Sequence, residues 1–394
     1  MNTSPLSRRR APAGVSPARR AIETQTARRL AGPSLMRLAA GSALALLLAL
    51  AAPGPSSAAG PVEAGGPERH ALEGGAISIY NLAGAVSVEP TEGEKVIVEV
   101  LAAGRDAGRL RVRTGPIGSR QTLRVVYPGT RVVYRESGHS GKTQIRVRED
   151  GSFGGNGSWS LWSGRTVTVA GSGGGLEAWA DLRVLVPRGR DVEVYLGVGA
   201  VKAAKVDAKL RLDTASGPVS TTDTRGALVV DVGSGRVSVT GATGPLTVDT
   251  GSGGVVAEGV SGGPISIDTG SGAVSGRNLR VHRLRVDTGS GGVTLREVGA
   301  DTVEIDTGSG HVEVDLASAP GSLVVDTGSG AVSVTVPPDL GAKLLLDTGS
   351  GGIDVDLPLT QVRRDGGEMS AQLGDGRGRI TIDTGSGGIR IGPR

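Results

Sequence analysis

From about residue 191 onward, apolar and polar positions alternate with a period of two inside a longer repeat. Each repeat has the form L-x-V-D-T-G-S-G-x-V-x-V, with apolar residues three and one positions before an aspartate and six positions after it. This alternation, rich in β-branched residues and interrupted by glycines, is typical of a strand, a turn and a second strand. The pattern therefore predicts two short strands per repeat that share one apolar face.

An aspartate marks each repeat and recurs at nearly constant spacing. The intervals between marker aspartates are 18, 18, 19, 19, 19, 20, 21 and 36 residues, and the last interval contains an irregular polar stretch at 358–379. Two further copies carry Tyr80 and Tyr195 at the marker position. Fixed-period similarity of this kind indicates a stacked repeat architecture. The marker aspartates are Asp213, Asp231, Asp249, Asp268, Asp287, Asp306, Asp326, Asp347 and Asp383.

A strand pair of this size cannot bury its own apolar face, but successive pairs stacked at the ordinary strand spacing of about 4.8 Å can. We therefore predict an all-β chain that folds as a single-chain, β-helix-like β-solenoid of 18–21-residue coils. The regular solenoid is expected over 191–394, with an insertion at 358–379. An irregular β-rich N-terminal part at 60–190 is expected to hold the first coil or coils and an aromatic segment.

The letters Asp-Thr-Gly-Ser also occur around the catalytic carboxylates of aspartic proteases. A protease dyad needs two carboxylates that share a proton, contributed by loops related by a two-fold axis. Nine marker positions at a fixed period give translation along an axis instead of a two-fold pair. We therefore expect no protease site, assign no catalytic or cofactor-binding residue, and predict that the chain is not an enzyme.

Two roles remain open for the marker aspartates. In the first, each Asp shapes a corner by accepting a hydrogen bond from the amide two residues on, an Asx-turn, with Gly251 and Gly253 and their equivalents at positive φ. In the second, stacked carboxylates and hydroxyls bind Ca²⁺, a hard ion that favours oxygen ligands. The calcium candidates are Asp249, Asp268, Asp287, Asp306, Asp326 and Asp347.

Composition and the N-terminus indicate an exported chain. The 394 residues contain no Cys, which excludes disulfides and thiolate sites. Residues 38–52 form a short apolar run preceded by Arg37 and followed by small residues, so 1–59 is predicted to be a signal or leader segment, with Met36 as an alternative start. Removal of 1–59 leaves 35 of the 43 basic and 38 of the 39 acidic residues. The remaining chain therefore lacks the basic footprint of a nucleic-acid-binding protein.

The large aromatic residues are confined to one region. Phe153, Trp159, Trp162 and Trp179 are the only Phe and Trp residues of the chain. They could cover the end of the solenoid or pack a small N-terminal sheet, because open ends need capping. Alternatively they could form an exposed platform for a glycan or a protein partner.

The stretches "GGAISIYNLAGAVSV" and "DLRVLVPRGRDVEVYLGVGAV", together with the L-x-V-D-T-G-S-G-x-V-x-V repeat, resemble the bacterial putative-adhesin family over residues 72–394. That family is a domain of unknown function made of β-strand repeats in exported or envelope-associated proteins, and it offers no catalytic residues to carry over. The resemblance implies an exported protein with an extracellular, periplasmic or envelope location. We expect contact with an envelope glycan or surface protein, and membrane attachment only through an uncleaved leader. The expected function is an adhesin or structural scaffold. A calcium-stabilised rod and a solenoid polysaccharide hydrolase or lyase, with a cleft where the insertion meets the aromatic segment, remain as alternatives.

Overall fold

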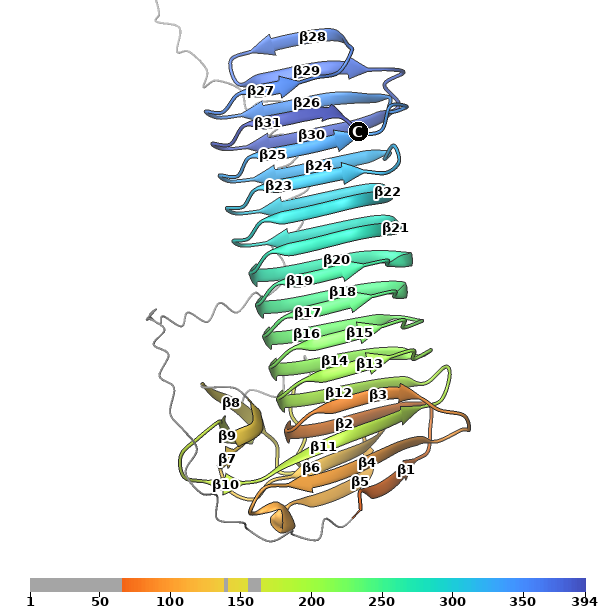
Figure 1. The fold of residues 1–394 in the computed structure, drawn as a ribbon, viewed down its shortest axis with the longest axis vertical. Coiled ribbons are helices and arrows are strands. Elements are labelled where there is room, and N and C mark those ends of the chain that lie inside the picture. The colour runs from red at the N-terminus through yellow and green to blue at the C-terminus, as the bar shows by residue number, and fades with distance from the viewer. Residues whose placement is uncertain (1–65, 138–140, 155–163) are drawn as a thin grey trace, which may run out of the picture.

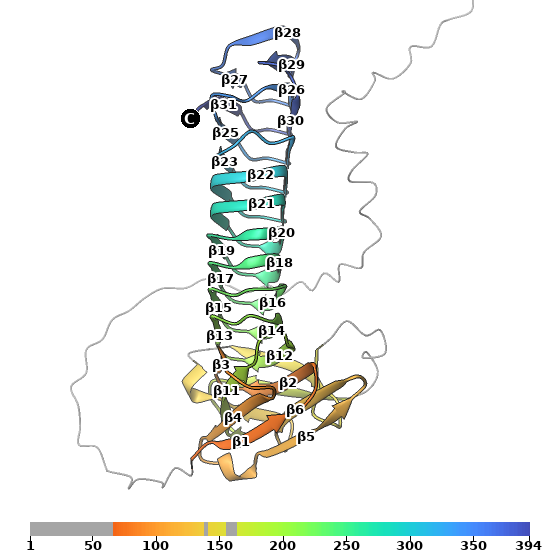
Figure 2. The ribbon, with the colours of Figure 1, turned by 90° about the vertical axis from the view of Figure 1, so that its right-hand side faces the viewer.

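The computed structural model describes residues 66–137, 141–154 and 164–394. Over these residues the chain forms a tall column of stacked strands that rises from a broader β-rich base (Figures 1 and 2). The β-solenoid predicted from the repeat is confirmed. The predicted leader at 1–59, Trp159 and Trp162 lie outside the described residues.

The base is built from the N-terminal strands and two short 3-10 helices, η1 (Ala107–Arg109) and η2 (Arg135–Ser137). Four strands of the base form a separate sheet in the order β10-β7-β9-β8. The strands of the base are β1 (Glu68–Leu72), β2 (Ala76–Ala83), β3 (Val86–Pro90), β4 (Val96–Ala103), β5 (Arg111–Ile117), β6 (Arg120–Val126), β7 (Arg131–Val133), β8 (Lys142–Val147), β9 (Arg165–Ala170), β10 (Leu176–Glu177) and β11 (Trp179–Val186).

The column is built from strands that alternate between two faces. Strands of the first face are β12 (Asp191–Val198), β14 (Lys209–Ser216), β16 (Leu228–Ser234), β18 (Thr243–Ser252), β20 (Ser261–Ser271), β24 (Ser322–Thr327), β26 (Ala342–Thr348) and β30 (Gly378–Thr384). Strands of the second face are β13 (Val201–Ala204), β15 (Val219–Thr222), β17 (Val237–Thr240), β19 (Val255–Glu258), β23 (Val312–Leu316), β25 (Val332–Val336), β27 (Ile353–Val355) and β31 (Ile389–Pro393). The long strands β21 (Val274–Thr288) and β22 (Val293–Thr307) each run from the second face of one coil into the first face of the next.

Equivalent residues of neighbouring coils pair in parallel and in register. Leu210 pairs with Leu228, and Leu228 in turn pairs with Leu246. The apolar positions three and one before each marker aspartate, and six after it, are all buried except Ile353, which is half-buried. Because strands with period two place alternate side chains on one face, these positions form the continuous ladders of Val, Leu and Ile that the sequence predicts.

The last coil does not stack in chain order. Strand β30 lies between β24 and β26, and β31 lies between β25 and β27. The coil marked by Asp383 is thus inserted between the coils marked by Asp326 and Asp347 (Figure 1). The expectation that successive repeats stack on one another is wrong at this end. After β25 the chain leaves the next coil position open and continues one position further with β26. The last coil, β30 and β31, occupies the open position.

The 358–379 insertion explains how the skipped rung is filled. It forms a hairpin of β28 (Leu359–Asp365) and β29 (Glu368–Leu373), and β29 pairs antiparallel with β26. The hairpin covers the outer edge of β26 and returns the chain to the level of β30. Covering an edge strand removes a row of unpaired backbone groups that could recruit another chain.

The N-terminal end of the column is covered in a similar way. The coil β2–β3 stacks under β12–β13 although residues 91–190 separate them along the chain. Its outer edges pair with β6 and β11, which then pair antiparallel with β5 and β4. Capping of the solenoid end by N-terminal strands follows the requirement that stacked repeats have closed ends.

Candidate functional site

The nine marker aspartates form one outward-facing column along the first face of the solenoid. Each is paired in register with the marker residue of the neighbouring coil, and the column continues at the base into Tyr195 and Tyr80. All of them lie on parallel strands, about 4.8 Å from the next. The column therefore contains no pair related by a two-fold axis, and the aspartic protease arrangement is absent from the part of the chain that the structure describes.

The Asx-turn role predicted for the aspartates is wrong. Each Asp lies within a strand. In the five coils marked by Asp287 to Asp383, the amide two residues after the Asp donates to a threonine carbonyl of the neighbouring coil, as Gly289 does to Thr269 and Gly308 to Thr288, both at 3.1 Å. In the four coils marked by Asp213 to Asp268, the residue two after the Asp still lies within the extended strand. Gly251 does not have positive φ, whereas Gly253 has φ of +149°. The correction covers Asp213, Asp231, Asp249, Asp268, Asp287, Asp306, Asp326, Asp347 and Asp383, which face outward from their strands as predicted.

The threonine after the aspartate shapes the corner instead. The hydroxyls of Thr327, Thr348 and Thr384 accept the backbone amide three residues on at 2.8–3.1 Å. The same hydroxyls donate to a glycine carbonyl of the neighbouring coil at 2.8–3.2 Å. Local hydrogen bonds of this kind stabilise turns. Sequence reasoning missed them, although period two places this position inward with the two apolar positions before it.

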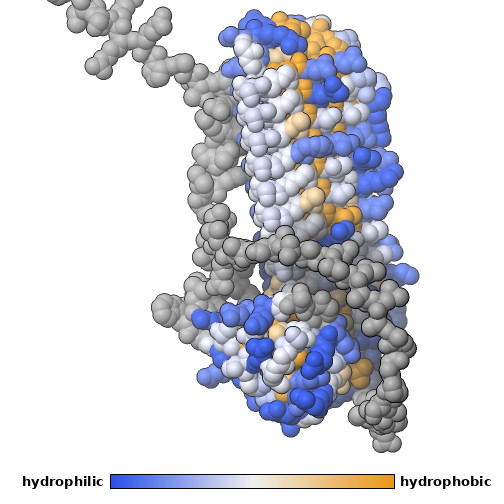
Figure 3. Space-filling model, turned by 60° about the vertical axis from the view of Figure 1, so that its left-hand side comes forward, coloured by the Kyte–Doolittle hydropathy of each residue, from blue (hydrophilic) through white to orange (hydrophobic). Residues whose placement is uncertain are grey.

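The glycines of the repeat are required because neighbouring coils approach closely. A Cβ on Gly291 would lie 2.2 Å from the Gly272 carbonyl oxygen, and one on Gly310 would lie 2.0 Å from the Gly291 oxygen. Cβ atoms do not approach backbone oxygens below about 3.0 Å. The fifth position of Asp-Thr-Gly-Ser-Gly is therefore fixed by stacking. Figure 3 shows one face of the resulting column, where a pale band of intermediate hydropathy runs beside hydrophilic side chains.

The electrostatics of the aspartate column are strongest at its base. Burial, reinforced by the neighbouring Asp231 carboxylate, raises the pKa of Asp213 to about 7. The Arg211 guanidinium opposes this shift, but it lies 3.8 Å from Asp213 and closer, at 3.0 Å, to Asp231. Burial also raises the pKa of Asp231, Asp249 and Asp268. Burial in the folded protein therefore disfavours ionisation of these four carboxyl groups.

We expect Asp213→Asn to stabilise the protein at pH 8 and to change its stability little at pH 4. An Asp whose pKa is about 7 when folded and near 3.8 when unfolded loses stability as pH rises through this interval, because only the folded state keeps the proton. The gain at pH 8 is at most about 4 kcal/mol, since one pKa unit corresponds to ~1.36 kcal/mol. Urea unfolding at pH 4 and pH 8 measures the change in unfolding free energy. Asp301→Asn, at an exposed position, is the control. An equal gain at pH 4 and pH 8 would count against the raised pKa.

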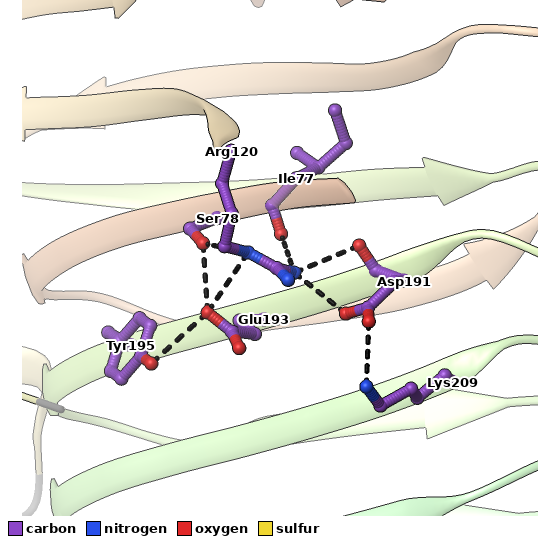
Figure 4. Close-up of polar contacts among 7 residues, drawn as sticks. All are labelled: Ile77, Ser78, Arg120, Asp191, Glu193, Tyr195 and Lys209. Carbon is purple, nitrogen blue, oxygen red and sulfur yellow. Dashed lines mark hydrogen bonds and ion pairs between the residues drawn. The ribbon is translucent and has the colours of Figure 1, made fainter. Parts of the chain in front are cut away.

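A polar network closes the junction between base and column (Figure 4). We call it the junction cluster; its members are Ser78, Arg120, Asp191, Glu193, Tyr195 and Lys209. Arg120 lies 2.8 Å from Asp191 Oδ1 and 3.2 Å from Glu193 Oε2, and it donates to Ser78 Oγ at 2.7 Å. Lys209 lies 2.8 Å from Asp191 Oδ2.

The charges of the junction cluster are mutually satisfied. Burial raises the pKa of Asp191, but hydrogen bonds from Arg120 and Lys209 outweigh it and hold the pKa below its usual value. Tyr195 donates to Glu193 Oε2 at 3.2 Å, and burial raises the pKa of Tyr195, which keeps this donor protonated. The cluster joins β2, β6, β12 and β14 and presents no unpaired base or nucleophile. Its role is structural.

Phe153 and Trp179, the described members of the predicted aromatic patch, are buried and do not form an exposed platform. Phe153 is 5% exposed and meets Tyr80 edge-on at 5.8 Å, and Tyr80 stacks on Tyr195 at 4.8 Å. Trp179 is 6% exposed and lies 5.4 Å from Tyr134. The platform prediction is wrong for Phe153 and Trp179, because both fill the base where large side chains are needed. Trp159 and Trp162 are outside the described residues.

The two alternatives from the sequence find no support in the geometry. Among residues 66–137, 141–154 and 164–394, no group of three or more His, Asp or Glu side chains is arranged to hold a metal ion. The β28–β29 insertion lies at one end of the column, and β2 and β11 lie at the other (Figure 1). Phe153 packs on Tyr80 of β2, and Trp179 is the first residue of β11, so both aromatic residues are far from the insertion. The cleft that a solenoid hydrolase would need between them therefore does not form.

Comparison with known proteins gives one family. A family described as Toastrack DUF4097 matches residues 180–392. A crystal structure of a putative cell adhesion protein from Clostridium sporogenes ATCC 15579 is similar over 83% of this chain and 100% of that chain, at 11% identity and a TM-score of 0.17. No protein of curated function matches. In the described part of the chain, no helix is long and apolar enough to cross a membrane.

Proposed function

The chain belongs to the Toastrack DUF4097 family, and we propose that it is an exported, non-enzymatic β-solenoid that acts as an adhesive or structural scaffold in the cell envelope. The observation that carries the proposal is the continuous core. One cluster of buried Val, Leu and Ile side chains runs from β2 in the base to β31 near the far end of the column. A core of stacked ladders has no interior space for a substrate, so function falls to the outer surface.

Export rests on the predicted leader at 1–59, with its apolar run at 38–52. Producing cells should carry the protein beyond the inner membrane, and deletion of 1–59 should retain it inside. Protease added to intact cells and to cells with a permeabilised outer layer measures this distribution. If the complete chain resists protease until the cytoplasm is opened, the exported scaffold is ruled out.

A scaffold or adhesin binds a surface component without changing it. We expect the purified protein to retain an envelope glycan or surface protein on a glycan array or in a pull-down from envelope fractions. Matched incubations analysed by mass spectrometry should show the glycans intact. Release of shortened or unsaturated sugar products would instead establish a hydrolase or lyase and contradict the proposal.

A further inference from the structure

An unusual concentration of arginines lines a pocket in the base, away from the aspartate column. The pocket has a volume of about 370 Å³ and lies among η1, the β5–β6 hairpin, the turn after β8 and the start of β9. This volume is within the range of roughly 300–1,000 Å³ typical of small-molecule sites. We call this cavity the arginine pocket. The arginines that line it are Arg109, Arg111, Arg113, Arg148 and Arg165. Among the described residues, Glu149 is the only carboxylate that lines it.

Three of these arginines are held in place by neutral groups. Arg111 donates to the carbonyls of Gly108 and Leu110 at 2.7 and 2.8 Å. Arg148 donates to Ser152 Oγ at 3.2 Å and to the Gly154 carbonyl at 3.3 Å, and Arg165 donates to the Tyr127 carbonyl at 2.5 Å. A guanidinium has five N–H donors, so these bonds fix the side chains and leave donors for a ligand.

Carboxylates neutralise the positive charge of the pocket only in part: Asp150 interacts electrostatically with Arg148, and Glu149 lines the pocket. None of its five arginines lies within 4.0 Å of a carboxylate among the described residues, whereas Arg120 and Arg183 of the same base each contact two. The nearby Asp150 turns an oxygen to Ser152, accepting from its amide and hydroxyl at 2.8 and 2.7 Å. Neighbouring cations repel one another, and they do so more strongly near a protein surface than in bulk water. A bound anion would relieve this repulsion.

A buried arginine beside the pocket adds to its charge. Arg124 pairs directly across the hairpin from Arg113, so the two side chains share one face of the β5–β6 sheet. Arg124 is only 9% exposed; its Nη1 donates to the Asp150 carbonyl at 3.4 Å and its charge interacts with the Asp150 carboxylate, while its Nε has no hydrogen-bond partner among the described residues. Buried polar groups are normally satisfied, and an unsatisfied one calls for an explanation such as a bound ion.

The lining also defines the organic part of a ligand. Val125, Val126, Val147 and Pro128 form apolar walls beside the guanidinium groups. Arginine forks match the oxygens of phosphate in paired hydrogen bonds, and apolar walls suit the carbon skeleton attached to it. We infer that the arginine pocket binds a phosphate ester of a small polyol or sugar, carried by a soluble or polymeric glycan or by a lipid head group.

Calorimetric titration of the purified protein with glycerol 1-phosphate and glucose 6-phosphate tests the inference. Both esters should bind, with affinity that falls as salt is added, while glycerol and glucose should not bind. The double variant Arg109→Gln/Arg113→Gln should weaken binding at least tenfold, because it removes two of the guanidinium groups that line the pocket. Both side chains are exposed, so the substitutions should leave the fold intact. The control Arg236→Gln/Arg363→Gln removes the same charge from exposed sites on the column and the hairpin, and should alter binding less than twofold.

Vesicles distinguish the two sources of the phosphate. Binding to phosphatidylglycerol vesicles but not to the soluble esters assigns the pocket to lipid head groups, and binding to the esters alone assigns it to glycans or polymers. Either result supports phosphate recognition by the pocket, provided that the pocket variant loses the binding and the control variant keeps it. Equal loss in the pocket and control variants, equal binding of charged and uncharged polyols, or no binding by any probe at millimolar concentration would overturn the inference.

Discussion

Replacing Gly291 with alanine is expected to destabilise the protein by roughly 3 kcal/mol or more, at the upper end of what overpacking costs. The new Cβ would lie 2.2 Å from the Gly272 carbonyl oxygen and 2.6 Å from its carbon. Both atoms are backbone of the neighbouring coil, which is held in register along both faces. Relief therefore requires the coils to separate and break ladder hydrogen bonds.

The adjacent glycine supplies a matched control. A Cβ on Gly292 would lie 3.5 Å from the His311 carbonyl oxygen, an ordinary contact, so Gly292→Ala should leave stability nearly unchanged. Urea unfolding followed by circular dichroism compares the two variants under identical conditions. If Gly291→Ala unfolds at the same urea concentration as Gly292→Ala, the coils are not stacked as closely as the structure shows.

The second large effect is expected for Thr384→Val, which should cost about 2–4 kcal/mol. The Thr384 hydroxyl is fully buried, accepts from the Gly387 amide at 3.0 Å and donates to the Gly330 carbonyl at 2.9 Å. Valine has the same shape but leaves both backbone groups without this partner. Each buried group so orphaned costs about 1–3 kcal/mol, and partial relaxation lowers the sum.

A threonine of the same column provides the comparison. The Thr250 hydroxyl is equally buried but has no hydrogen-bond partner, so Thr250→Val should be neutral or slightly stabilising. Thermal melting of the two variants separates a hydrogen-bonding role from simple packing. Equal destabilisation by both substitutions would show that the threonine column stabilises the corners through shape alone.

Much of the fold was predictable because one physical requirement repeats in every coil. Period-two alternation decides which side chains are inward, and the interior found at Leu246, Val248 and Val255 is the one that the pattern predicts. The same period-two alternation predicts that the side chains of Thr250 and its equivalents point into the core. The role of the aspartate was mistaken because turn propensity was weighed for a residue that lies within a strand.

The order of the last coils could not be predicted from the pattern. The coils marked by Asp326, Asp347 and Asp383 present nearly identical apolar ladders, so each could stack on either of the others. The order is set by the β28–β29 hairpin, which pairs with β26 and leaves the rung below it for β30. The arginine pocket was equally hidden, since η1, β5, β8 and β9 meet only through the tertiary fold.

Cysteine cross-linking tests most directly whether the coils stack in register with the last one inserted. The chain contains no native Cys, so introduced pairs can be read without interference. Ser333 and Arg390 are register partners on adjacent strands, whereas Ser333 and Asp354 are separated by the inserted β31. Their Cα atoms should lie about 4.8 and 9.6 Å apart. Disulfides need Cα separations of about 4.4–6.8 Å.

Mass spectrometry after mild oxidation gives the outcome. We predict that Ser333→Cys/Arg390→Cys forms an intramolecular disulfide in nearly all molecules and that Ser333→Cys/Asp354→Cys stays reduced. A disulfide between residues 333 and 354, with none between 333 and 390, would mean that the coils stack in chain order and would contradict the structure.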